Sequence, residues 1–129
     1  MPTARAAFAG LALVALTAMT GCASHPGPGA ATTGDAAAIR VTSSADACDL
    51  STTTAPAGSL TFSVSNTGTD VTEFYLLSAD GQHVVAEVED IGPGLSRDLV
   101  VHAEPGTYVA ACKPGMKGDG IRQDFTVTQ

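Results

Sequence analysis

The amino-acid sequence predicts one all-β domain, a sandwich of about seven or eight short strands. Three observations lead to this prediction. Apolar and β-branched segments recur about every eight to twelve residues, with turns rich in Gly, Pro, Asn and Asp between them. Several segments alternate apolar with polar residues, which is the period of a strand with one buried face. Beyond the N-terminal region, no stretch of the sequence has helical periodicity.

Residues 1–21 are organised like the signal peptide of a bacterial lipoprotein. Arg5 precedes a small and apolar run from residue 6 to residue 19, which is too short to span a bilayer as a stable helix. The run ends in Met19-Thr20-Gly21-Cys22. This sequence resembles a lipobox, although Leu is usual where Met19 stands, and we therefore expect lipidation of Cys22. Ordinary secretion, with Cys22 as an incidental thiol, is the alternative.

Residues 22–37 have the composition of a flexible tether, because they are rich in Ala, Gly, Pro and Thr and show no periodicity. A tether of this length reaches about 20 Å, which is enough to hold a domain just off a membrane. The folded domain then comprises residues 38–129. We therefore expect a lipid-anchored protein on the extracytoplasmic face of the cell membrane.

The charge balance argues against two classes of partner. The full chain has a formal net charge of −7, and loss of Arg5 with the signal peptide leaves 13 acidic against five basic residues, a net charge of −8. Such an acidic chain favours neither nucleic-acid binding nor electrostatic attachment to anionic lipid. The sequence also lacks a GxSxG elbow, an HExxH motif and a phosphate-binding glycine loop, so we expect no enzymatic activity.

The first strands are expected between residues 39 and 65. Segments 39–42 and 47–50 open the domain on either side of a turn that contains Ser and Asp, and 55–58 (APAG) has the composition of a second turn. The clearest alternation follows at 60–65 (LTFSVS), where Leu, Phe and Val face the core and the hydroxyl side chains face water.

The later strands begin with residues 71–78 (VTEFYLLS), which are apolar on both faces, as expected of a central strand. Asp80-Gly81 is a strong hairpin signal, and 84–89 is the returning strand. A break at Gly92-Pro93-Gly94 follows. Three further strands are expected after it, at 95–103, 107–112 and 121–128.

Cys48 and Cys112 remain as an even pair once Cys22 carries lipid. In an oxidising compartment they can form a disulfide, provided that their strands lie at the same end of the sandwich. Such a bond would close a loop of 64 positions (112 minus 48) and stabilise the domain by about 4 kcal/mol. The alternative is metal ligation, because thiolates suit copper(I), whereas carboxylates suit harder cations such as ferric iron.

Further candidate ligands lie near Cys112 and in the central strand. The turn after Cys112 supplies Met116 and Asp119. Glu73 lies within VTEFYLLS, where a buried carboxylate is costly unless it is hydrogen-bonded or holds a cation. An exposed Glu on a sheet face is the alternative. The histidines are expected to be solvated, in the tether, in a hairpin and on an outward strand position: His25, His83 and His102.

Four stretches, in the order VTEFYLL, VEDIGPGLSRDL, PGTYVAACKPGMKGDGI and DFTVT, closely resemble the EfeO-type cupredoxin-like domain. The resemblance covers residues 39–128. That domain occurs at the N-terminus of EfeO, the exported component of a bacterial ferrous-iron uptake system, and also alone in small lipoproteins. The resemblance implies a cupredoxin-like Greek-key sandwich that binds iron or copper at the cell envelope. EfeO continues into a helical imelysin domain that this sequence does not contain, so we expect the stand-alone lipoprotein form.

The resemblance also implies a metal region, which maps onto Cys48, Glu73 and Cys112, with Met116 and Asp119 as weaker additions. The sequence departs from blue-copper proteins, which need two histidines and a cysteine. In such proteins a histidine normally lies between the Cys and the Met of the last loop, whereas Lys-Pro-Gly lies there in this chain.

Three hypotheses for the function follow. The first is a membrane-anchored protein that binds copper or iron and assists EfeO-type iron uptake, with an iron permease or a peroxidase of that system as its partner. The second is a non-catalytic interaction module stapled by a disulfide between Cys48 and Cys112. The third, electron transfer by blue copper, requires a histidine ligand that the sequence does not reveal.

Overall fold

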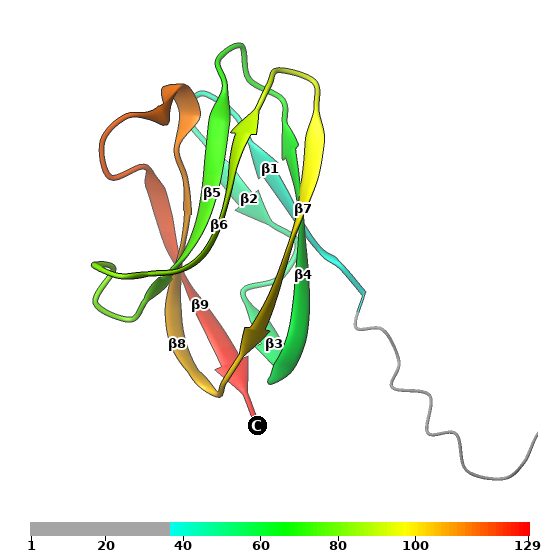
Figure 1. The fold of residues 1–129 in the computed structure, drawn as a ribbon, viewed down its shortest axis with the longest axis vertical. Helices are drawn as coiled ribbons and strands as arrows, with labels where there is room; N and C mark the ends of the chain where they lie inside the picture. Colours follow the sequence, from blue (N-terminus) through cyan, green and yellow to red (C-terminus); the bar gives the residue numbers. More distant parts are fainter. Residues whose placement is uncertain (1–36) are drawn as a thin grey trace, which may run out of the picture. The chain divides into compact units, whose positions relative to one another are not determined.

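The computed structural model describes residues 37–129 and folds them into two facing β-sheets (Figure 1). Within this range the one helical element is a short 3-10 turn, η1 (Pro114–Met116). None of these residues forms a helix long and apolar enough to cross a bilayer. The expected signal peptide, the expected lipidation site Cys22 and the expected tether up to residue 36 lie outside the described residues.

One sheet has four strands and the other has five. The order in the four-stranded sheet is β2 (Cys48–Leu50), β1 (Ile39–Ser43), β4 (Gly58–Asn66) and β7 (Ser96–Ala103). The order in the five-stranded sheet is β3 (Thr54–Pro56), β9 (Ile121–Thr128), β8 (Gly106–Cys112), β5 (Thr72–Ser78) and β6 (Val84–Ile91). β1 runs parallel to β4 and β3 runs parallel to β9, while all other neighbours are antiparallel.

The predicted all-β sandwich is confirmed, but the strand number is higher than expected. The described residues form nine strands because Thr54–Pro56, where we expected a turn, pairs with the end of β9. The Thr126 amide donates to the Thr53 carbonyl at 2.9 Å, and the Ala57 amide donates to the Thr128 carbonyl at 2.8 Å. Pro56 is compatible with this pairing because β3 lies at the edge of its sheet, where a missing amide costs least.

The core lies between the two sheets and is centred on three phenylalanines. Phe62 of β4 is fully buried, and its ring centroid lies 5.2 Å from that of Phe74 and 5.3 Å from that of Phe125. The predicted inward positions Leu60, Phe62 and Val64 are all buried. Each large apolar side chain buried in this way stabilises the fold by about 1.5–3 kcal/mol, so the strand alternation largely determines which residues form the core.

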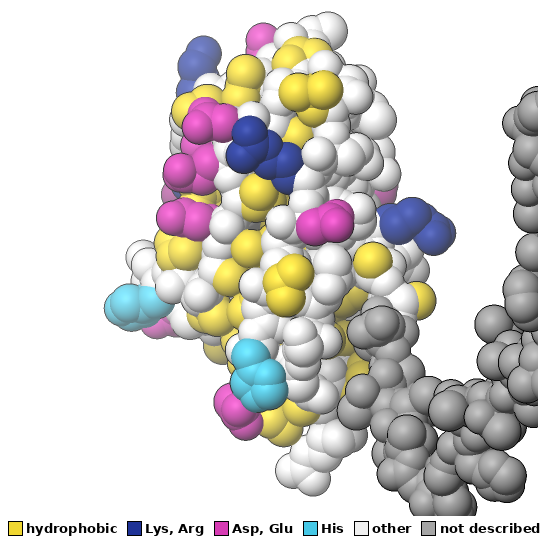
Figure 2. Space-filling view, turned by 45° about the vertical axis from the view of Figure 1, so that its right-hand side comes forward, with side chains coloured by type: hydrophobic (Ala, Val, Ile, Leu, Met, Phe, Trp, Pro, Cys, Tyr) yellow, Lys and Arg dark blue, Asp and Glu magenta, His cyan; other side chains and the backbone are white. Residues whose placement is uncertain are grey.

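The outer faces of the two sheets differ. The four-stranded sheet presents hydroxyl side chains outward along β4, and on the side that carries β4 and β7 apolar side chains lie among polar and charged ones (Figure 2). The five-stranded sheet instead has a second small core on its outer face, formed by Tyr75, Leu77, Ala111 and the partly buried Val109. β5 is therefore buried on both faces, as its sequence predicts.

The hairpin between β5 and β6 and the loop after β8 lie at opposite ends of β5 (Figure 1). The β8–β9 loop is fixed to β5 by two backbone hydrogen bonds, from the Lys113 amide to the Glu73 carbonyl (2.9 Å) and from the Gly115 amide to the Val71 carbonyl (2.8 Å). The end of the sandwich that carries Cys112 is therefore close to Glu73.

Candidate functional site

Cys48 and Cys112 are joined by a disulfide that connects the two sheets. Cys48 begins the short edge strand β2, and Cys112 ends β8, with an S–S distance of 2.02 Å and a Cα–Cα distance of 5.5 Å. Cys112 is fully buried and Cys48 is buried within the same core cluster. In this oxidised state neither cysteine offers a thiolate to a metal ion.

Glu73 lies on the outer face of β5 and is only 7% exposed. The Tyr75 hydroxyl donates a hydrogen bond to Glu73 Oε2 at 2.7 Å, and the same hydroxyl lies 3.4 Å from Glu89 Oε1 of β6. Glu87 pairs directly with Tyr75 across the two strands and therefore shares its face. Together Glu73, Tyr75, Glu87 and Glu89 form what we call the outer-face cluster.

The surroundings of the Tyr75 hydroxyl keep it protonated. Burial is the largest cause that raises the pKa of Tyr75 above its usual value, followed by the hydrogen bond to Glu73 and by the negative charges of Glu73, Glu89 and Glu87. Lys113 Nζ lies 4.4 Å from the centroid of the Tyr75 ring and covers it from solvent with a cation–π contact. The outer-face cluster thus combines three carboxyl groups and one phenol, and the Lys113 ammonium group lies beside it.

Met116 and Asp119, which the sequence proposes as further ligands, lie in the β8–β9 loop with exposed side chains. Met116 is 48% exposed and has a positive φ of 57°. The Asp119 side chain is 94% exposed, and its carboxylate lies 3.7 Å from the Arg122 guanidinium. The loop backbone is bonded to β5, but no group of three or more His, Cys, Asp and Glu side chains among residues 37–129 is placed to hold a metal ion.

Comparisons with known proteins assign the family. The sequence model of the cupredoxin-like domain matches residues 10–127, which is most of the chain. This chain belongs to the cupredoxin-like family. The EfeO-type assignment within that family stays a prediction. A search of curated protein sequences finds no match.

Among solved structures, the domain is similar to dithionite-reduced auracyanin from the photosynthetic bacterium Roseiflexus castenholzii. The two share 24% sequence identity with a TM-score of 0.58, and the match covers 71% of this chain and 97% of that chain. At this identity the similarity establishes the cupredoxin-like fold.

The described residues of this cupredoxin-like domain do not fit a type 1 copper centre, which takes one thiolate and two imidazoles. Cys112 is held in the disulfide. His83 lies in the β5–β6 hairpin, 3.6 Å from the Asp80 carboxylate, at the far end of β5 from Cys112. His102 lies on β7 of the other sheet, 3.5 Å from Glu104. Neither described imidazole approaches the cysteine.

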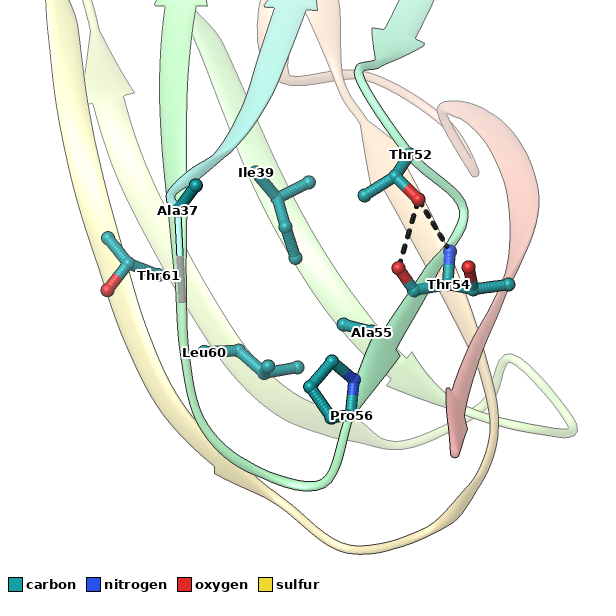
Figure 3. Close-up of a pocket in the computed structure, with 8 residues that line it drawn as sticks. All are labelled: Ala37, Ile39, Thr52, Thr54, Ala55, Pro56, Leu60 and Thr61. Carbon is teal, nitrogen blue, oxygen red and sulfur yellow. Dashed lines mark hydrogen bonds between the residues drawn. The ribbon is translucent and has the colours of Figure 1, made fainter. Parts of the chain in front are cut away.

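A pocket of about 190 Å³ lies elsewhere, between β3 and the beginnings of β1 and β4 (Figure 3). Its lining is mostly apolar, with three threonines, and the Thr52 hydroxyl is hydrogen-bonded within the wall to the Thr54 carbonyl at 2.9 Å. The residues that line it are Ala37, Ile39, Thr52, Thr54, Ala55, Pro56, Leu60 and Thr61. Since none of them is ionisable, the pocket supplies no charged ligand or catalytic base.

Sequence reasoning singled out Glu73 but missed its partners Tyr75 and Glu89. Tyr75 belongs to an apolar segment, so its ring predicts burial and says nothing about its hydroxyl. Glu89 is the last residue of the expected strand 84–89, and nothing in the sequence pairs it with Tyr75. The signal that was available is the Asp80-Gly81 hairpin, because it makes the strands on either side neighbours and places two glutamates of β6 beside Tyr75.

Proposed function

We propose that this chain is an extracytoplasmic, lipid-anchored cupredoxin-like protein that carries a metal ion and assists iron uptake of the EfeO type. One observation carries the proposal: the Tyr75 hydroxyl lies within 2.7 Å of Glu73 and 3.4 Å of Glu89. The Tyr75 hydroxyl is therefore within hydrogen-bond distance of one carboxylate oxygen from each of two neighbouring strands on the outer face. The ion is the cargo of the protein, and the proposed role is that of a carrier without catalysis.

The chemistry of these donors favours a hard cation. Carboxylates and phenolates suit hard cations such as ferric iron, whereas copper(I) prefers thiolates and thioethers. Because Cys48 and Cys112 form a disulfide, neither of them provides a thiolate ligand for copper(I). Of the two metals considered from the sequence, the outer-face cluster supports iron better than copper.

The electrostatics of the cluster also favour a cation. Burial raises the pKa of Tyr75 most, and the hydrogen bond to Glu73 and the coulombic effect of Glu73, Glu89 and Glu87 raise it further. A bound trivalent ion reverses this effect, since it neutralises the carboxylates and stabilises the phenolate. Binding of such an ion through the Tyr75 oxygen would release the hydroxyl proton to solvent, and Lys113, whose Nζ lies 4.4 Å from the ring centroid, would have to give way to the incoming charge.

Ferric iron titration of the chain from residue 23 onward tests the proposal. This chain omits Cys22 and contains every described strand and the whole described core. We expect stoichiometric iron after equilibrium dialysis against a weak iron chelator, and a visible phenolate-to-iron charge-transfer band. Tyr75→Phe removes the band, and Glu73→Gln weakens binding at least about tenfold.

Asp49→Asn is the matched control, because Asp49 is an exposed carboxylate on β2 of the other sheet and its loss should leave iron binding unchanged. The carrier proposal fails if the wild-type chain retains no iron. It fails equally if Tyr75→Phe and Glu73→Gln bind iron as the wild type does.

The disulfide favours a second candidate, the non-catalytic interaction module. In that function Cys48 and Cys112 stabilise the sandwich, and the protein presents a surface to an envelope partner without carrying an ion. A chain that retains neither iron nor copper and has no titratable thiol supports the module over the carrier. Blue-copper electron transfer, the third hypothesis, requires an intense visible band on addition of copper(II), and we expect none.

A further inference from the structure

The described part of the sandwich has four sheet edges, and three of them are protected against pairing with another strand. β2 and β3 have three residues each, and β3 ends in Pro56. β6 is interrupted by two register irregularities, one of them beside Asp90 with its positive φ of 56°, and it carries three acidic side chains. Short strands, proline, bulges and charges are the usual means by which proteins keep sheet edges unpaired.

β7 is the exception among these edges. It is eight residues long and pairs with β4 in an unbroken register, from Ser96 opposite Ser65 to Ala103 opposite Gly58. It contains neither proline nor lysine, and its two charged residues, Arg97 and Asp98, lie together near its start and not at its centre. Its outward residue Val100 is 65% exposed, the largest exposure among the large apolar side chains of the described residues. A long, regular edge strand with an exposed β-branched residue at its centre is suited to accept another strand.

We propose that β7 pairs antiparallel with β7 of a second copy of this chain, with Val100 opposite Val100 of the second copy. The two four-stranded sheets then become one sheet of eight strands, related by a two-fold axis between the two valines. The exposed apolar side chain of each copy is covered by that of the other. This pairing does not depend on metal binding at the outer-face cluster, which lies on the other sheet.

Hydrogen-bond complementarity favours this partner and this register. With Val100 at the axis, Asp98 lies opposite His102 of the second copy, and the pair occurs twice. Each Asp98 carboxylate can accept a hydrogen bond from the facing imidazole, whose Nε2 lies 3.5 Å from Glu104 of its own copy. On the core-facing side Leu99 lies opposite Val101 of the second copy, so apolar residues also meet apolar residues.

The neighbouring registers lose these contacts. If one copy slides along the other by one residue, core-facing residues come to lie opposite outward-facing ones. If it slides by two residues, so that the axis passes between the two Val101 residues, Asp98 lies opposite Glu104 of the second copy, and the two carboxylates repel each other. A shift that centres the axis on Leu99 leaves Asp98 opposite Val100. The sequence of β7 is therefore self-complementary in one register.

The net charge of the chain opposes association, so we expect a weak, reversible dimer. Analytical ultracentrifugation of the chain from residue 23 onward should show its mass rising from one chain toward two as the concentration increases. His102→Asp places a carboxylate opposite Asp98 and should return the mass to one chain. The double variant Asp98→His/His102→Asp restores the same pairs in reversed order and should recover the dimer.

Cysteine cross-linking tests the register itself. Val100→Cys places a thiol opposite its own counterpart, and mild oxidation should join two copies covalently. Ser59→Cys, an outward position on the neighbouring strand β4, is the control for random collision and should cross-link far less. Both variants replace exposed side chains, and an unchanged thermal unfolding midpoint verifies their fold.

Three results overturn the proposal. The first is a wild-type chain that stays monomeric up to its solubility limit, even if β7 accepts a strand from a different protein. The second is a dimer that His102→Asp leaves intact or that the double variant fails to restore. The third is equal cross-linking at positions 100 and 59.

Discussion

The disulfide between Cys48 and Cys112 should supply a large share of the stability of the domain, and its removal is the prediction with the best-defined magnitude. The bond closes a loop of 64 positions. In the chain-entropy treatment, the loss of this cross-link frees the unfolded chain by about 4 kcal/mol. A domain of this size has a total free energy of unfolding of about 5–15 kcal/mol, so the loss is a quarter or more of the total.

The variant Cys48→Ala/Cys112→Ala, made in the chain from residue 23 onward, measures this contribution. A loss of about 4 kcal/mol lowers the unfolding midpoint by about 15–30 °C. Chemical denaturation followed by circular dichroism gives the free energy directly, and thermal unfolding gives the midpoint. Reduction of the wild-type chain should reproduce most of the effect, because it breaks the same bond without changing the sequence.

The single variants provide the control. Cys48→Ala and Cys112→Ala should each destabilise the domain nearly as much as the double variant, because either change breaks the one shared bond. Two single losses that add up in the double variant would show that the two sulfur atoms act independently. Unchanged stability after full reduction would refute the entropic argument for this loop.

Three further predictions concern the core, the tyrosine and the last loop. Phe62→Ala, at the centre of the aromatic core, should reduce the free energy of unfolding by about 3–5 kcal/mol in a denaturant titration. Because the folded state raises the pKa of Tyr75, it holds that proton longer than the unfolded state does, so stability should fall as the pH rises above the usual tyrosine pKa of about 10. A pH series of unfolding midpoints should show a shallower alkaline loss for Tyr75→Phe, and an identical loss would contradict the assignment. Gly120→Ala should cost at least about 2 kcal/mol, because φ is +77° and the new Cβ would lie 2.5 Å from the Cys112 carbonyl oxygen. Gly94→Ala, with a φ of +75° and open space around it, should cost only about 1–2 kcal/mol, and equal losses by calorimetry would refute the steric argument.

The alternation of apolar and polar residues was enough to predict the sandwich and its core. At 60–65 the period of two directly assigns Leu60, Phe62 and Val64 to the core, since a strand has two faces and the core takes one. β3 could not be predicted in this way, because Thr54–Pro56 has too few residues to show a period. Its assignment as a strand depends on hydrogen bonds to β9, some 70 positions away in the chain.

The candidate site was less predictable because it depends on strand register. That Glu73 is a mid-strand carboxylate is visible in the sequence, but which hydroxyl or carboxyl group lies beside it is not. The Tyr75 hydroxyl meets Glu89 because β6 pairs with β5 in a register that contains irregularities, and such irregularities have no clear sequence signal. The second small core on the outer face has the same origin, since the register of β5 and β8 places Tyr75 opposite Ala111 and Leu77 opposite Val109.

The arrangement of β8 separates the stabilising disulfide from the proposed metal site. Cys112 faces the core and is joined there to Cys48, whereas Ala111 and the outer-face cluster lie on the opposite side of the same sheet. The disulfide thus lies on the core face of the five-stranded sheet, and the oxygen donors lie on its outer face. Reduction of the disulfide should therefore lower stability without abolishing iron binding under conditions where the reduced chain stays folded. Tyr75→Phe should abolish the iron charge-transfer band in a chain whose disulfide is intact. If instead reduction alone removes iron from a folded chain, or creates a copper site in it, the cysteines are the ligands and the outer-face cluster is not the site.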